Sequence, residues 1–262
     1  MDPIPTCDIL IFVATRSEER ALIAAAHERG VRVEPRDGAL GPFYWFGHVG
    51  PNRVVAVRTA MGPLGYRGSG ARAVHYVSAT QATGAISVGM AFGCDPGSQE
   101  LGDVIVGTQI VPYDNRDVRS DDTGAPVVDY ARVRRRRAKN SLVRMMERGA
   151  QQQQRQRVHF GALLSGAARI HCAAYRDHLR DAVPQQGDRI VGGEMEGVGL
   201  LSASDPNDPN WIVVKAICDF ADEQRDDVIE DWRSAASTQA ATFVLGALAA
   251  GPCDLGANDE PA

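Results

Sequence analysis

"DILIFVATRSEERAL", residues 8–22, places an unbroken apolar run directly before a segment rich in charged residues. A run of this kind is typical of a strand buried inside a sheet. Residues 17–29 then show helical spacing, with Ser17 as the predicted N-cap and Gly30 as the predicted stop. A strand that leads straight into a helix is the repeating unit of α/β domains.

The same succession of strand and helix continues along the chain. Further apolar runs of strand length lie at 53–59, 85–90, 104–111, 159–164, 189–191 and 211–218. Helical patterns lie at 65–79, 137–148, 175–182, 196–202 and 234–248. Turn sequences near 41–52 predict an early antiparallel hairpin. We therefore expect an α/β fold, a three-layer αβα sandwich around a mixed, largely parallel central sheet, over residues 1–250, with a flexible tail over 251–262.

Composition narrows the class of protein. The chain has 262 residues, of which 44% are hydrophobic and 23% charged, as in one large globular domain. We expect neither a membrane span nor a signal peptide, because no apolar run is long enough and no basic region precedes the first one. The five cysteines show no CxxC spacing, which favours a reducing, cytoplasmic location over disulfides or a zinc site.

One stretch is strongly basic although the net charge is -5. Residues 132–157 contain ten lysines and arginines and a single acid, Glu147. We interpret the stretch as a solvated surface, with binding of nucleic acid or polyphosphate as the alternative. The acidic balance of the whole chain argues against a general nucleic-acid binder.

Acidic residues follow several predicted strands. They are Glu18 and Glu19 after the first, Glu194 and Glu196 in "VGGEMEGVG" (191–199), and Asp219 and Asp222 after the last. Because ligands collect where the strands of such sheets end, we expect these acids to line one crevice. An acidic crevice suits metal binding or acid–base chemistry at a glycosidic bond. The chain has no EF-hand, HExxH or GxxxxGK[ST] motif, and for each acid alone a structural role is the default.

The order of five motifs resembles the purine nucleoside phosphorylase/nucleosidase superfamily, which includes methylthioadenosine/S-adenosylhomocysteine nucleosidase. They are "DILIFVATRSEERAL", "AISVGMAFGCDPGSQELGDVIVG", "FGALLSGAARI", "GGEMEGVG" and "VVKAICDFAD". Within the superfamily the chain looks closest to nucleosidase-like effector domains of bacterial antiviral defence systems, some of which cleave adenine from ATP or related nucleotides. The resemblance implies a homo-oligomer, a dimer or larger, with a small-molecule purine substrate and no metal or organic cofactor.

The resemblance also implies roles for individual residues. Glu196 would hold the ribose hydroxyls, with Met195 against the sugar, and Asp219 would protonate the purine at N7. Glu18 or Glu19 would activate the attacking water, and Glu19 fits the helix pattern slightly better. Arg169 replaces the aromatic residue that stacks on the base in the family, and Ile170 would lie beside the base. The other expected substrate contacts are Met90, Ala91, Phe92 and Glu194.

The sequence favours hydrolysis over phosphorolysis. Where phosphorylases of this superfamily place an arginine and a serine, this chain has Ser87 and Met90. The alternatives are a phosphate-dependent phosphorylase and a non-catalytic nucleotide sensor. A triphosphate substrate would need basic residues, for which the candidates are Arg16, Arg67, Arg72 and the stretch 132–157.

Overall fold

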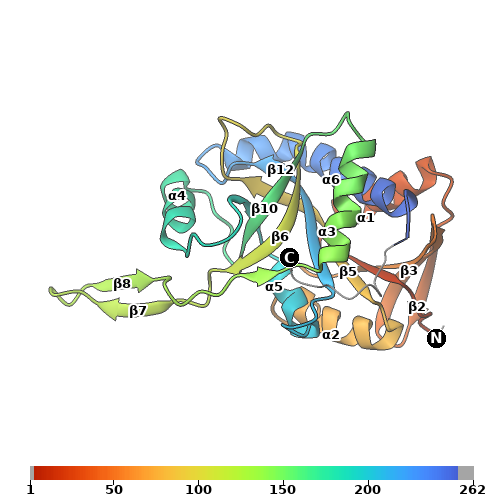
Figure 1. Ribbon diagram of the computed structural model, residues 1–262, viewed down its shortest axis with the longest axis horizontal. Coiled ribbons are helices and arrows are strands. Elements are labelled where there is room, and N and C mark those ends of the chain that lie inside the picture. Colours follow the sequence, from red (N-terminus) through yellow and green to blue (C-terminus); the bar gives the residue numbers. More distant parts are fainter. Residues whose placement is uncertain (1–2, 253–262) are drawn as a thin grey trace.

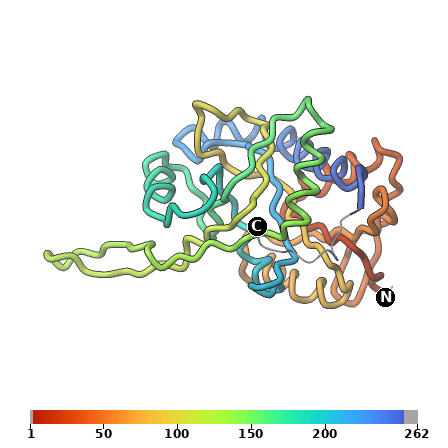
Figure 2. Tube along the Cα trace, in the orientation of Figure 1, coloured from red at the N-terminus to blue at the C-terminus, as the bar shows by residue number. Residues whose placement is uncertain are grey.

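All five residues of β1 (Ile9–Val13) are buried, as the apolar run predicts, in a computed structural model that describes residues 3–252. β1 lies inside a ten-stranded sheet. Figure 1 draws the strands as arrows, and Figure 2 traces the same chain as a tube. The other strands of this sheet are β2 (Glu34–Gly38), β3 (Gly41–Val49), β4 (Asn52–Arg58), β5 (Gly84–Gly93), β6 (Val104–Pro112), β9 (Arg136–Arg137), β10 (Val158–Ser165), β11 (Ile190–Glu194) and β12 (Trp211–Asp219).

The strand order is β11-β10-β6-β12-β5-β1-β4-β3-β2, with β9 paired to β6. β1 pairs in parallel with both of its neighbours, β4 and β5. Three further pairs are also parallel: β5–β12, β6–β10 and β10–β11. The pairs β2–β3, β3–β4 and β6–β12 are antiparallel. This confirms the mixed, largely parallel sheet, and it confirms the early antiparallel hairpin.

The sheet also closes on itself where β11 meets β5. Gly192 and Gly193 pair antiparallel with Gly93 and Phe92. A Cβ on Gly192 would lie 2.4 Å from the carbonyl oxygen of Phe92, and one on Gly193 would lie 2.2 Å from the Phe92 ring. The paired glycines of the "GGEMEG" motif are therefore explained first by the close approach of two strands, and not only by room for a ligand.

Helices cover both faces of the sheet (Figure 1). On one face α6 (Arg225–Ala249) packs against α1 (Arg16–Glu28), α3 (Asn140–Gln152) and strands β5 and β12. On the other, α2 (Ser69–Thr80) packs against α5 (Gly197–Leu200) and the 3-10 helix η1 (Leu201–Ala203). The predicted three-layer sandwich is confirmed. No helix among residues 3–252 combines the length and apolar character that a membrane span needs.

The first helix begins two residues earlier than its sequence suggested. Thr15, and not Ser17, is the N-cap: its hydroxyl accepts from the Glu18 amide at 3.2 Å, and the Glu18 carboxylate accepts from the Thr15 amide at 2.7 Å. This capping box fixes Glu18 at the end of β1. The predicted stop is confirmed, because Gly30 has φ +73° directly after the last turn.

Two further features differ from the sequence analysis. α6 begins at Arg225, well before the predicted residue 234, and its acidic first turn masks the apolar pattern. A hairpin of β7 (Asp117–Ser120) and β8 (Pro126–Asp129) extends away from the sheet (Figure 1), although no strand is predicted there. α4 (Ala173–Ala182) was predicted at 175–182. Apart from residues 251 and 252, the expected tail lies outside the described residues.

Candidate active site

A cavity of about 500 Å³ opens where β1, β5, β11 and β12 end. Residues from all four strand ends line it, together with the loop 168–170 and the first turns of α6. The lining includes Ala14, Thr15, Glu18, Met61, Met90, Ala91, Phe92, Arg169, Ile170, Glu194, Met195, Glu196, Asp219, Arg225 and Arg233. The structure thus brings the predicted site residues together at one place, with the exception of Glu19.

Glu18 lies on the cavity wall and is nearly enclosed. One carboxylate oxygen accepts from the amides of Ala14 (2.8 Å) and Thr15 (2.7 Å), and the other accepts from the Met90 amide at 2.9 Å. The side chain passes so close to β5 that a Cβ on Gly89 would lie 1.9 Å from Glu18 Oε1. Three backbone donors therefore hold this carboxylate in one orientation at the junction of β1 and β5.

Glu19 points away from the cavity, which corrects the slight preference for Glu19 as the residue of the reacting site. Its carboxylate accepts from the Tyr44 hydroxyl at 2.8 Å and pairs with Arg58 at 3.4 Å. The reason is the start of the helix: with Thr15 as N-cap, residue 18 is the N3 position that folds back onto the strand end, and residue 19 points outward.

A buried lysine anchors the second carboxylate. Lys215 on β12 is 0% exposed, and its Nζ lies 3.0 Å from Glu196 Oε2. The other Glu196 oxygen accepts from the Gly62 amide at 3.1 Å. Burial alone would lower the pKa of Lys215, but the nearby carboxylates of Glu196, Glu18 and Glu194 outweigh it, so the pKa lies above its usual value. Lys215 therefore stays cationic.

Glu194 contacts both the backbone of the "EMEG" turn and Lys215. Its Oε2 accepts from the amides of Glu196 (2.9 Å) and Gly197 (2.8 Å) and lies 3.8 Å from Lys215 Nζ. The side chain is fully enclosed, and Oε1 has no hydrogen-bond partner among the described residues. Burial raises the pKa of this carboxyl. The predicted role of Glu194 in direct substrate contact is thus less well supported than a role in shaping the "EMEG" turn.

Asp219 ends β12 on the cavity wall and is only 3% exposed. Its Oδ1 accepts from the Ala221 amide at 2.8 Å, while Oδ2 accepts from the Cys218 thiol at 3.0 Å and lies 3.5 Å from Arg225. Burial raises its pKa, more than the hydrogen bonds and Arg225 lower it. The carboxyl is therefore suited to hold a proton and give it up.

Cys218 is buried, as expected for a core residue, and burial raises the pKa of its thiol well above the usual value. It is therefore a protonated donor to Asp219 rather than a nucleophile. Cys7, Cys94, Cys172 and Cys218 all carry free thiols. Within residues 3–252 no group of three or more His, Cys, Asp or Glu side chains is arranged to hold a metal ion.

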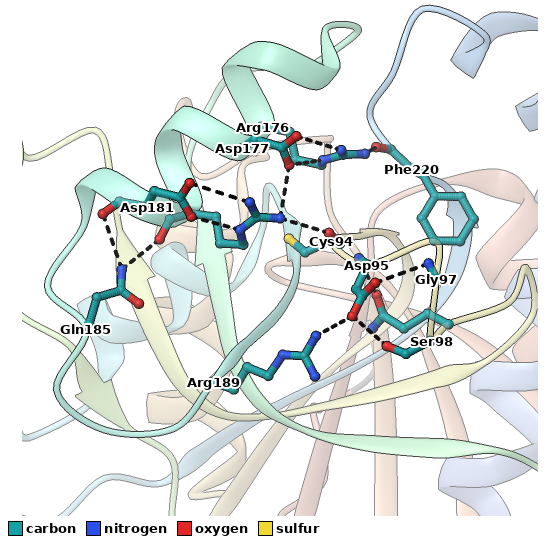
Figure 3. A network of polar contacts seen from close by, with 12 residues as sticks. Cys94, Asp95, Gly97, Ser98, Arg176, Asp177, Asp181, Gln185, Arg189 and Phe220 are labelled. Atoms are coloured by element: carbon teal, nitrogen blue, oxygen red, sulfur yellow. Dashed lines mark hydrogen bonds and ion pairs between the residues drawn. The ribbon is translucent and has the colours of Figure 1, made fainter.

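A polar network fixes the chain just beyond Asp219 (Figure 3). Arg176 on α4 donates to the Phe220 carbonyl at 2.6 Å and pairs with Asp177 at 2.9 Å. On the loop after β5, Asp95 accepts from the Ser98 hydroxyl at 2.7 Å and pairs with Arg189. The network ties α4 and two loops together around the end of β12.

Sequence reasoning missed two kinds of residue. Lys215 carried a usable signal, because a lysine inside the apolar run "WIVVKAICD" must find a buried partner. Arg225 and Arg233 line the cavity from a part of α6 that was not predicted as helix. The stretch 132–157 contributes no lining residue to this cavity.

Comparison with known proteins finds one matching family and one relative of known name. A model of the phosphorylase superfamily matches residues 8–249. A death domain-containing ATP nucleosidase from Amphimedon queenslandica is 28% identical over 177 residues, which is 61% of this chain but only 32% of that protein. The chain therefore spans about a third of this relative's length.

Solved structures share the fold at low sequence identity. A 5′-methylthioadenosine/S-adenosylhomocysteine nucleosidase from Neisseria meningitidis, in complex with methylthio-immucillin-A, superposes with a TM-score of 0.73 at 19% identity, covering 92% of this chain and 98% of that one. A futalosine hydrolase of Helicobacter pylori gives a TM-score of 0.71 at 18% identity, covering 92% and 96%.

Proposed function

Because the chain belongs to the phosphorylase superfamily, whose model covers residues 8–249, we propose that it hydrolyses the N-glycosidic bond of an adenine nucleoside or nucleotide and releases adenine. The observation that carries this proposal is the buried Asp219, with its raised pKa, in the same cavity as Glu18 and Glu196. The names of the curated relative and of the nucleosidase from Neisseria meningitidis support adenine as the base.

Departure of the base requires a proton on the base side. A purine leaves poorly as an anion and well once a ring nitrogen is protonated. Asp219 offers that proton: burial favours its protonated form, and the Ala221 amide and Cys218 thiol fix its orientation. After transfer, the resulting carboxylate is stabilised by Arg225 at 3.5 Å. Met90, Ala91, Phe92 and Ile170, with the exposed Arg169, would enclose the base.

The sugar develops positive charge as the bond breaks, and a fixed carboxylate stabilises it. In this proposal Glu196 accepts hydrogen bonds from the ribose hydroxyls, with Met195 against the sugar. Lys215 and the Gly62 amide hold the Glu196 carboxylate in place. Preorganised charge of this kind costs no rearrangement during the reaction.

Glu18 would take the proton of the attacking water. An oriented carboxylate acts as a general base toward water, whereas it repels an incoming phosphate dianion. Its place on the cavity wall therefore favours hydrolysis over the phosphorylase alternative. A nucleotide sensor without turnover has no need for a protonated acid at the base, so Asp219 argues against that alternative.

Adenine release, followed by chromatography, tests the proposal. The panel comprises methylthioadenosine, S-adenosylhomocysteine, adenosine, AMP and ATP, each with and without phosphate. We expect phosphate-independent adenine release that Asp219→Asn and Glu196→Gln both abolish. Strict dependence on phosphate would instead establish a phosphorylase. Saturable nucleotide binding without release, unchanged by Asp219→Asn, would establish a sensor.

We further propose that the protein acts in the cytoplasm as a homo-oligomer in antiviral defence, with ATP or a related nucleotide as substrate. Its resemblance to defence effector domains and the name of the relative from Amphimedon queenslandica support this. Light scattering on the purified protein measures the oligomer. Phage challenge of cells that express the wild type or Asp219→Asn tests the defence role: equal plaque numbers on both would contradict it.

A further inference from the structure

A second hollow, of about 270 Å³, lies beside the cavity and is strongly cationic. Five arginines and one carboxylate line it: Arg16, Arg20, Arg58, Arg67, Arg72 and Glu19. We call it the arginine pocket. The arginines come from α1, the end of β4, the loop before α2 and α2 itself, so only the fold brings them together.

The positive charge of the arginine pocket is largely uncompensated. Glu19 accepts from Tyr44 at 2.8 Å and pairs with Arg58 at 3.4 Å, which offsets one guanidinium group. The side chains of Arg16, Arg20 and Arg67 form no hydrogen bond or ion pair with any other residue in the described part of the chain. Guanidinium groups remain charged at all physiological pH values, so the pocket attracts anions.

Arg72 gives an independent indication of an anion-binding site. It is only 6% exposed and its guanidinium lies 5.5 Å from the centre of the Tyr76 ring. Nη1 donates to the Leu40 carbonyl, but the buried Nε has no hydrogen-bond partner among residues 3–252. No carboxylate pairs with Arg72 in that part of the chain. A buried cation in this state is costly unless an anion joins it.

The arginine pocket adjoins the cavity along α1 and the loop before α2. Along the first turn of α1, Thr15 and Glu18 line the cavity, while their neighbours Arg16 and Glu19 line the arginine pocket. The loop before α2 does the same with Met61 and Arg67, and it is closed by the Ala60 amide, which donates to the Arg67 carbonyl at 2.6 Å. Asp219, the proposed proton donor to the base, lines the cavity but not the arginine pocket.

We propose that the arginine pocket binds the 5′-polyphosphate of the nucleotide whose glycosidic bond is cleaved. This rests on the proposed function, since it assigns the substrate of the same site to the class of nucleoside polyphosphates. Guanidinium forks match phosphoryl oxygens in pairs, and several of them are needed to neutralise a triphosphate. A thioether or a free hydroxyl at the 5′ position would leave these arginines unused.

Charge removal at exposed positions tests the pocket with little risk to folding. In the double variant Arg16→Gln/Arg67→Gln, we expect the ratio of kcat/KM for ATP to kcat/KM for adenosine to fall by about 10-fold to 100-fold, since each lost guanidinium removes a charge-assisted contact. The matched control Arg134→Gln/Arg136→Gln removes two exposed arginines of the stretch 132–157 and should leave the ratio unchanged. An equal loss on both substrates, or an effect only in the control, would overturn the proposal.

Binding separates this proposal from the proposed function. On Asp219→Asn, titration calorimetry with ATP and with inorganic tripolyphosphate should show binding that Arg16→Gln/Arg67→Gln weakens by the same factor. This readout needs no turnover, so it stands even if adenine is never released. Tripolyphosphate should also compete with ATP. If it binds without competing, the pocket is a separate anion site and the assignment to the substrate's own phosphates is wrong.

Discussion

Replacing Lys215 with methionine is predicted to lower the protein's free energy of unfolding substantially. Its Nζ lies 3.0 Å from Glu196 and 3.8 Å from Glu194, and Lys215 is 0% exposed. At an effective dielectric constant of about 20, these two attractions amount to roughly 5.5 and 4.4 kcal/mol. Desolvation of the three groups offsets much of that attraction, but it is not recovered when only the cation is removed. We therefore expect a loss of about 3–5 kcal/mol.

Urea unfolding followed by circular dichroism measures this loss. The matched control is Asp208→Asn, which breaks the Lys139–Asp208 pair at 3.4 Å, where the Asp208 side chain is 82% exposed. That variant should lose less than about 1 kcal/mol. Adding Glu196→Gln to Lys215→Met should restore part of the stability, since it removes an unpaired buried charge.

The stability of the wild type and that of Lys215→Met should depend on pH in different ways, and the direction of the difference can be predicted. In the wild type the raised pKa of Lys215 means that its contribution is present at neutral pH and is lost only as pH rises through that pKa. The deficit of Lys215→Met should shrink in acid, because protonation neutralises the stranded carboxylates. A deficit below about 1 kcal/mol at neutral pH, or one that grows in acid, would refute the reasoning.

Three further predictions concern the carboxylates. Asp219→Asn should abolish adenine release but raise the free energy of unfolding at neutral pH by about 0.5–2 kcal/mol. The reason is that the pKa of Asp219 is raised in the folded protein, so the stability of the wild type falls as pH rises above the unfolded pKa of 3.8. In strong acid, urea titrations should show no gain in stability. Gly89→Ala should displace Glu18, since the new Cβ would lie 1.9 Å from Glu18 Oε1, and it should therefore lower kcat steeply. The control is Gly251→Ala, whose new Cβ would have no atom within 4 Å. Equal kcat values for the two variants would contradict the role assigned to Glu18. In steady-state assays, Glu18→Gln should lower kcat by about 10²–10⁴-fold, and Glu19→Gln should lower it by less than about 10-fold. The reverse order would mean that Glu19 activates the attacking water.

Much of the fold could be predicted because its signals are local. β1 is apolar along its whole length, and β12 is apolar except for Lys215 and its last residue, Asp219, so the sequence predicts that both strands are buried on both faces. The β7–β8 hairpin lacked any such signal: Val118, Val127 and Val128 are exposed, and no buried face imposes alternation. The predicted helix at 234–248 is shorter than α6 for a similar reason: the first turn of α6 carries Asp226 and Asp227 instead of core residues.

The candidate site was predicted in composition but not in detail. Glu196 and Asp219 follow recognisable strand ends, and the structure places both on the cavity wall. The choice between Glu18 and Glu19 depended on one residue of helix register, which the capping box of Thr15 decides. The sequence offered Arg16, Arg67 and Arg72 as basic candidates beside the stretch 132–157, but only tertiary structure shows that the three meet in one pocket.

The most direct test of the central claim is the fate of isotopically labelled water during turnover of an adenine nucleotide. Hydrolysis of the N-glycosidic bond predicts free adenine and the heavy oxygen on the sugar carbon that held it, detected by mass spectrometry and absent with Asp219→Asn. Label in inorganic phosphate, with the base still attached, would contradict the account, and unlabelled sugar phosphate would show that phosphate is the nucleophile.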